Sequence, residues 1–97
     1  MGFNLDLDFR VHDDIDEAID YYNTKSNKAA LRLYNEIQEA YRILSLNPFF
    51  EIRYSDYRCF PIKDFPYMFH FTVNEKENIV QIHALFNTSK DPIAFWL

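Results

Sequence analysis

Two segments in the second half of the chain, 67–74 and 79–86, constrain the fold most strongly. Both are rich in aromatic and β-branched residues, and apolar residues recur at every second position, as expected for half-buried strands. The four residues between them, 75–78, are polar and suit a short hairpin loop. The sequence therefore predicts an antiparallel β-hairpin with one face packed on the core.

A symmetric loop sets the register of this hairpin. Phe71 then lies opposite Ile82, and the apolar faces of the two strands coincide. The same register predicts that His70 and His83 are directly cross-strand neighbours on the other face. The predicted core face comprises Phe69, Phe71, Val73, Val80, Ile82, Ala84 and Phe86.

A further strand is predicted at 58–62, joined to the hairpin by a turn at 63–66. Pro61 has no N–H to donate, so this strand is expected to be at an edge or bulged there. Residues 49–56 are expected to form a linker or an irregular edge piece. Together with the hairpin, the strand makes an antiparallel meander.

The first half of the chain predicts one strand and two helices. Residues 3–11 alternate apolar and polar positions, which indicates a half-buried strand. Asp14 and Glu17 are spaced like a capping box, so a helix is expected from there to about Tyr22. A second helix is predicted over 28–46, where apolar residues recur at steps of three and four. The predicted fold is therefore α+β: an N-terminal strand, a helical hairpin, then an antiparallel β-meander with the helices packed on one sheet face.

Length and composition narrow the class of protein. The chain has 97 residues, so we expect one domain spanning 1–97. The single Cys59 excludes an internal disulfide and a cysteine-based zinc cluster. Neither a secretory signal nor a membrane-spanning stretch is present, which favours a cytoplasmic protein. The net charge is −5, and the acidity is concentrated in residues 1–24, which hold seven acids and one arginine.

Several short motifs resemble the RelE/ParE superfamily, the toxins of bacterial type II toxin–antitoxin systems and plasmid-stabilisation-type proteins. The motifs follow the order of that family and span most of the chain. They are AIDYYN at 18–23, Asn47-Pro48 after the second helix, Arg58, FPY at 65–67 and LFNTSKDP at 85–92. The resemblance implies the same α+β fold.

The resemblance also implies two kinds of activity. ParE-like members block DNA gyrase without chemistry of their own, whereas RelE-type members cleave messenger RNA on the ribosome with basic residues and often Tyr or His on the exposed sheet. Candidate catalytic residues for the second activity are Arg58, His70, His83 and Lys90, which would neutralise phosphate or transfer protons. Many relatives have His where Asn87 stands and Arg where Lys90 stands, so this sequence departs from the nuclease pattern. Asn transfers no proton, and Lys lacks the bidentate fork of Arg.

The favoured interpretation is a ParE-like toxin that inhibits DNA gyrase, with enzymatic activity left open. The alternatives are a RelE-type endoribonuclease and a degenerate member that only binds its antitoxin. No metal or cofactor is predicted, since two histidines are too few ligands for a closed zinc site. The histidines would otherwise be two half-exposed side chains on a solvated sheet face. The residues expected to contact an antitoxin or target are Tyr21, Tyr34, Tyr41, Lys63, Tyr67, Phe95 and Trp96.

Overall fold

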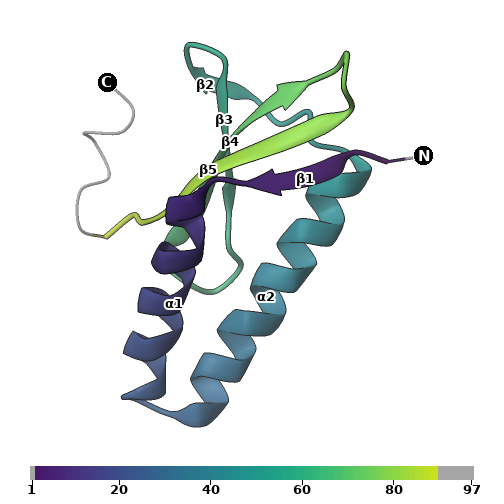
Figure 1. Cartoon of the computed structure of the whole chain (residues 1–97). Coiled ribbons are helices and arrows are strands. Elements are labelled where there is room, and N and C mark those ends of the chain that lie inside the picture. The colour runs from purple at the N-terminus through teal and green to yellow at the C-terminus, as the bar shows by residue number, and fades with distance from the viewer. Residues whose placement is uncertain (1, 90–97) are drawn as a thin grey trace.

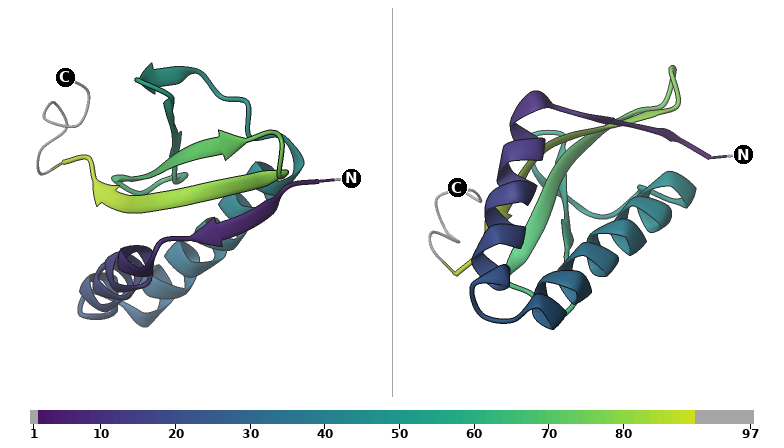
Figure 2. Two further views of the ribbon diagram at one scale, coloured as in Figure 1. Left: turned by 45° about the horizontal axis from the view of Figure 1, so that its top comes forward. Right: turned by 60° about the horizontal axis from the view of Figure 1, so that its bottom comes forward.

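The computed structural model describes residues 2–89 and places two helices against one side of a β-sheet (Figure 1). The two further views in Figure 2 agree that both helices lie on the same side. The elements in chain order are β1 (Asn4–Leu7), α1 (Phe9–Asn23), α2 (Asn27–Leu46), β2 (Ile52–Tyr54), β3 (Tyr57–Pro61), β4 (Tyr67–Asn74) and β5 (Ile79–Asn87).

The sheet has five strands in the order β1-β5-β4-β3-β2. Strands β2 to β5 form an antiparallel meander, and β1 joins its far edge parallel to β5. Because β1 and β5 are parallel, the helical hairpin must cross back over one face to connect β1 with the meander. The predicted α+β architecture is therefore confirmed.

Helix α2 packs on the sheet through an apolar stripe with the predicted three-and-four spacing. Ser26 caps its N-terminus, because the Ser26 hydroxyl accepts hydrogen bonds from the backbone N–H groups of Lys28 and Ala29. At the other end Asn47 is extended, as expected for the residue before Pro48. The buried residues of α2 are Ala30, Leu33, Ile37, Ala40 and Leu44, which join Phe69, Phe71 and Ile82 of the sheet in one core.

Helix α1 begins five residues earlier than the capping-box spacing predicted. Strand β1 ends at Leu7, and residues 9–11 are helical rather than extended. Val11 is fully buried and continues the helical stripe through Ile15 and Ala18, whereas Phe9 is 87% exposed. The predicted capping box at Asp14 and Glu17 is wrong. Asp8 occupies the N-cap position, although its side chain makes no capping hydrogen bond there.

A β-bulge changes the predicted register of the hairpin. Phe71 pairs with Ile82 as predicted, but His70 pairs with Ala84, so His83 is the extra residue on β5. The predicted direct pairing of His70 with His83 is therefore wrong. Beyond the bulge every position moves by one, and Leu85 lies opposite Phe69 in the core where Ala84 was expected.

Strand β3 lies between β4 and β2, so the prediction that this strand is at an edge or bulged at Pro61 is wrong, and β2 is the edge strand. Pro61 lies at the end of β3, beyond the two residues of β3 that pair with β2, so its missing N–H leaves no gap in the ladder. The segment expected to be an irregular edge piece contains β2, three exposed residues with a register shift. None of the helices within residues 2–89 is long and apolar enough to cross a membrane.

Candidate functional site

A chain of hydrogen bonds on the sheet face away from the helices includes one of the two predicted histidines. The Asp8 carboxylate lies 2.9 Å from His83 Nδ1, and His83 Nε2 lies 2.8 Å from Thr72 Oγ1. Because an ionised carboxylate only accepts, Nδ1 carries a proton, and Nε2 of the neutral ring is left to accept from the Thr72 hydroxyl. A carboxylate, an imidazole and a hydroxyl are thus connected in series by hydrogen bonds.

This chain also ties the N-terminal segment to the sheet. The second carboxylate oxygen of Asp8 accepts from the Gln81 side-chain amide, and the Asp8 backbone N–H donates to the Ile82 carbonyl at 2.8 Å. Both oxygens of the carboxylate therefore have partners on β5. We call Asp8, Thr72, Gln81 and His83 the Asp8–His83 tie.

His70 lies beside the tie without being part of it. The ring of Tyr57 lies 4.5 Å from the His70 ring and 5.2 Å from the His83 ring, measured between centroids, and so bridges the two histidines. Burial lowers the pKa of His70, and the neighbouring His83 and Arg10 side chains lower it further. His70 is consequently a neutral imidazole at pH 7 rather than a ligand for phosphate.

The predicted cations do not gather around these histidines. Arg58 pairs with Phe71, so it lies on the helix-facing side of the sheet. Its guanidinium donates to the Phe50 carbonyl at 2.6 Å and lies 5.4 Å from the Phe49 ring centroid. Lys63 is exposed in the turn before β4 and lines a hollow between α2 and β3, and Lys90 falls outside the described residues.

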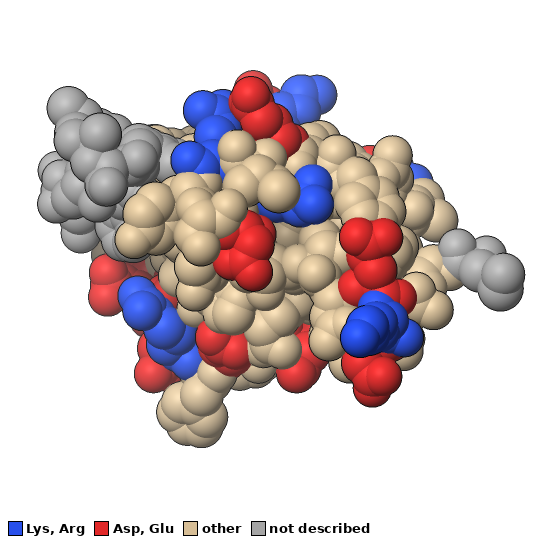
Figure 3. Space-filling view, turned by 90° about the horizontal axis from the view of Figure 1, so that it is seen from above, with Lys and Arg blue, Asp and Glu red and all other residues tan. Residues whose placement is uncertain are grey.

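Charge on the uncovered sheet face is mixed. Figure 3 views the molecule from above, and Lys and Arg are scattered there among Asp, Glu and uncharged residues. An extended contact with nucleic acid needs several cations in reach of successive phosphates. The described part of this face offers no such basic surface.

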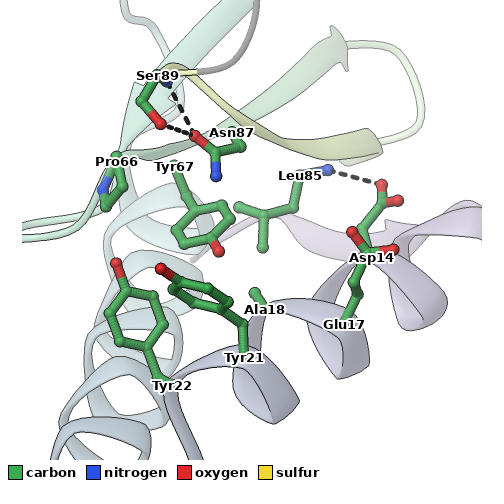
Figure 4. Close-up of a pocket in the computed structure, with 10 residues that line it drawn as sticks. All are labelled: Asp14, Glu17, Ala18, Tyr21, Tyr22, Pro66, Tyr67, Leu85, Asn87 and Ser89. Carbon is green, nitrogen blue, oxygen red and sulfur yellow. Dashed lines mark hydrogen bonds between the residues drawn. The ribbon is translucent and has the colours of Figure 1, made fainter. Parts of the chain in front are cut away.

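A cavity of about 330 Å³ opens between α1 and the ends of β4 and β5 (Figure 4). Sequence reasoning identified two of its tyrosines, Tyr21 and Tyr67, but not the cavity. We call it the tyrosine pocket. Its lining residues are Asp14, Glu17, Ala18, Tyr21, Tyr22, Pro66, Tyr67, Leu85, Asn87 and Ser89.

The polar groups of the tyrosine pocket are phenols, carboxylates, an amide and the hydroxyl of Ser89. Burial raises the pKa of Tyr67, and the neighbouring phenols and the carboxylate of Glu17 raise it further. Burial and Tyr21 likewise raise the pKa of Tyr22. The Asn87 side chain accepts from the backbone N–H of Ser89 at 2.9 Å, so Asn87 shapes the pocket wall.

The residues predicted to contact a partner have different exposures. Tyr21 and Tyr34 are 52% and 51% exposed, as expected for part of an interaction surface. Tyr41 is half-buried and stacks on Phe69 at 5.5 Å, and burial raises its pKa to about 12. Tyr67 is buried. Phe95 and Trp96 lie outside the described residues, and the partner role of the whole set stays a prediction.

The described residues hold no group of three or more His, Cys, Asp or Glu side chains placed to bind a metal ion. The site chemistry available in residues 2–89 is thus that of the Asp8–His83 tie and the tyrosine pocket. Asp8, Thr72 and Glu17 were missed as site residues. Their roles depend on contacts between β1, α1 and the hairpin that no local pattern encodes.

Comparison with known proteins identifies the fold. No protein-family model matches the sequence, and no curated protein matches it significantly. Among solved structures, a chain of the chromosomal ParDE TA system from P. aeruginosa superposes with a TM-score of 0.73. The match is 18% identical and covers 88% of this chain and 95% of that chain. The protein therefore has the fold of that ParDE chain, which confirms the RelE/ParE-like fold implied by the sequence motifs.

Proposed function

We propose that this protein is the toxin component of a type II toxin–antitoxin module and acts in the bacterial cytoplasm under control of a cognate antitoxin. The observation that carries the proposal is the superposition on the ParDE chain over nearly the whole of both chains. The motifs between residues 18 and 92 that resemble the RelE/ParE superfamily support it independently, because that resemblance depends on the sequence alone. The half-exposed rings of Tyr21 and Tyr34 are suited to binding a partner.

We further propose DNA gyrase as the target, as in ParE-like relatives. Three features disfavour cleavage of messenger RNA. Arg58 lies on the opposite sheet face from His70 and His83, Asn87 has no proton to transfer, and the uncovered sheet face has no basic surface among the described residues. A nuclease needs a cation and a proton-transfer group within reach of one phosphate.

The runner-up function is a ribosome-dependent endoribonuclease, and the Asp8–His83 tie favours it. An imidazole oriented by a carboxylate is a suitable general base, and the 2.8 Å between Nε2 and Thr72 Oγ1 is a distance at which the Nδ1–H tautomer would accept a hydrogen bond from a hydroxyl. On this alternative the 2′-hydroxyl of RNA would replace Thr72 as the partner of His83.

The test expresses the protein from a tightly repressed promoter without an antitoxin. Growth arrest, inhibition of supercoiling by purified gyrase and no new messenger 5′ ends are the expected results. Codon-positioned cleavage that disappears in His83→Ala or Asp8→Asn, with gyrase unaffected, would overturn the gyrase proposal in favour of the nuclease. His12→Ala, an exposed histidine on α1, is the matched control. Binding of an antitoxin without growth arrest or either activity would identify a degenerate member.

A further inference from the structure

We propose that the tyrosine pocket binds one cationic side chain, the guanidinium of Arg or the ammonium of Lys, presented by a protein partner. The assignment of the cation to a protein partner rests on the proposed function. The preference of the pocket for an organic cation does not, because it follows from the residues that line the cavity.

The aromatic walls are the first reason. Tyr22 packs edge-to-face against Tyr21, with ring centroids 5.0 Å apart, and against Tyr67 at 6.2 Å. Figure 4 shows the hydroxyl ends of these three rings turned toward one another at the mouth of the cavity. Phenol oxygens and ring faces both attract cations. Tyr21 already attracts one, since the ammonium of Lys25 lies 5.3 Å from its ring centroid.

The charge of the lining is the second reason. Among the described residues that line the pocket, Asp14 and Glu17 are the charged ones, and none is Lys or Arg. One oxygen of Asp14 accepts from the backbone N–H of Leu85 at 3.1 Å, which fixes the carboxylate beside the cavity. Glu17 forms no ion pair within residues 2–89, and its charge already acts on the Tyr67 phenol. Arg10, itself largely exposed, lies 3.9 Å from the Asp14 carboxylate, so Glu17 carries the unpaired negative charge of the described lining. A bound cation would relieve that charge.

Size and surroundings indicate what carries the cation. A volume of about 330 Å³ is at the lower end of the range for ligand sites and suits one long side chain rather than a nucleotide. Asp13, Asp16 and Asp20 are further exposed acids of α1 that lie outside the pocket lining, so the helix as a whole is strongly acidic. Such a surface repels phosphate and favours a basic polypeptide segment.

The test uses small probes on the isolated full-length chain, so that it requires no antitoxin. N-acetylarginine methylamide and N-acetyllysine methylamide are titrated while backbone amide shifts are followed by NMR. N-acetylglutamine methylamide, which lacks charge, is the matched probe. We expect saturable shifts at Glu17, Tyr21 and Tyr67 with the two cationic probes and none with the neutral one. Glu17→Gln should weaken binding by at least about threefold.

Asp20→Asn is the matched variant, because it removes one negative charge from α1 without touching the pocket lining. It should leave the affinity of both cationic probes unchanged. Equal shifts with the glutamine probe, shifts spread over the surface without saturation, or equal losses in Glu17→Gln and Asp20→Asn would each overturn the proposal. Selective cation binding in a chain that neither arrests growth nor binds an antitoxin would overturn the proposed function and leave the pocket assignment intact.

Discussion

The Asp8 carboxylate accepts a hydrogen bond from the His83 ring at 2.9 Å, although 75 residues separate the two in sequence. The contact joins the N-cap residue of α1 to the extra residue of the β5 bulge. It is made possible by the parallel pairing of β1 with β5, which brings Asp8 to the side of Ile82. One hydrogen bond therefore connects the three parts of the fold: the first strand, the helical hairpin and the meander.

A double-mutant cycle on Asp8 and His83 tests the energy of this contact. Each single change to Ala is expected to lower the free energy of unfolding by about 1–2 kcal/mol, since a hydrogen bond to a charged group is lost at a partly exposed site. The coupling energy should be about 1 kcal/mol, because either change removes the same interaction. Urea unfolding measures all four proteins.

Asp6→Ala is the control for that cycle, since Asp6 is an exposed acid on β1. It should change stability by less than about 0.5 kcal/mol. Additive losses from Asp8→Ala and His83→Ala would show that the contact contributes nothing in solution.

The bulge explains why the register was only half predictable from sequence. From Phe71 to Asn74 the pairing follows the apolar pattern, and prediction and structure agree. At His83 an extra residue enters, and the pattern does not mark it because Ala84, Leu85 and Phe86 are all apolar. Because three consecutive residues are apolar, the strand can place apolar side chains in the core both with and without the bulge. Packing of Leu85 against α1 decides between them, and that information is not local.

His70 gives a prediction on pH. Its pKa in the folded chain lies below the ordinary 6.5, mainly because it is buried. As pH falls below about 6.5, the unfolded chain binds a proton at this residue before the folded chain does. The free energy of unfolding should therefore rise with pH up to about 6.5 and lose part of this dependence in His70→Gln. Thermal unfolding from pH 5 to 8 measures both proteins.

The exposed His12 supplies the comparison for that experiment. His12→Gln should keep the pH dependence of the unchanged protein. The slope of the free energy of unfolding against pH is compared between the unchanged protein and His70→Gln. If the two slopes coincide, folding does not change the pKa of His70.

Cys59 is predicted to be unreactive while the chain is folded. The residue is buried, and desolvation raises the pKa of its thiol to about 11, only partly opposed by the charge of Arg53. At pH 8 only about one thiol in a thousand is then ionised. Reaction with Ellman's reagent should be at least about 100-fold slower in buffer than in 6 M guanidinium chloride. Equal rates would mean that β3 opens readily.

The start of α1 shows a second limit of pattern reasoning. Residues 3–11 alternate as a strand would, but Val11, Ile15 and Ala18 also have helical spacing, so the two periodicities overlap at Val11. The connection between β1 and α1 decides whether residues 9–11 are extended or helical. Strand β1 has to end at Leu7 so that the helix can cross the sheet. The second helix had no such overlap, and its predicted limits differ from the observed ones by one residue.

Asp14, expected to form a capping box, instead bonds to the sheet, and this gives the last prediction. Its carboxylate accepts the backbone N–H of Leu85 at 3.1 Å, two residues beyond the bulge, where the strand register has just shifted. Asp14→Ala leaves that part-buried N–H without its acceptor and should cost about 1–2 kcal/mol of stability.

Asp13→Ala is the matched control, because the neighbouring acid is exposed and has no such bond. Helix propensity and the loss of one negative charge near the N-terminus of α1 are common to both variants. Asp14 also pairs with Arg10 at 3.9 Å, but Arg10 is largely exposed and such a surface pair contributes less than about 1 kcal/mol, so most of the difference in urea unfolding reports the bond to Leu85. Amide hydrogen exchange at Leu85 should also accelerate in Asp14→Ala alone. Equal stability of the two variants would show that water replaces the carboxylate at no cost, and that the bond from Asp14 to Leu85 does not hold α1 to β5.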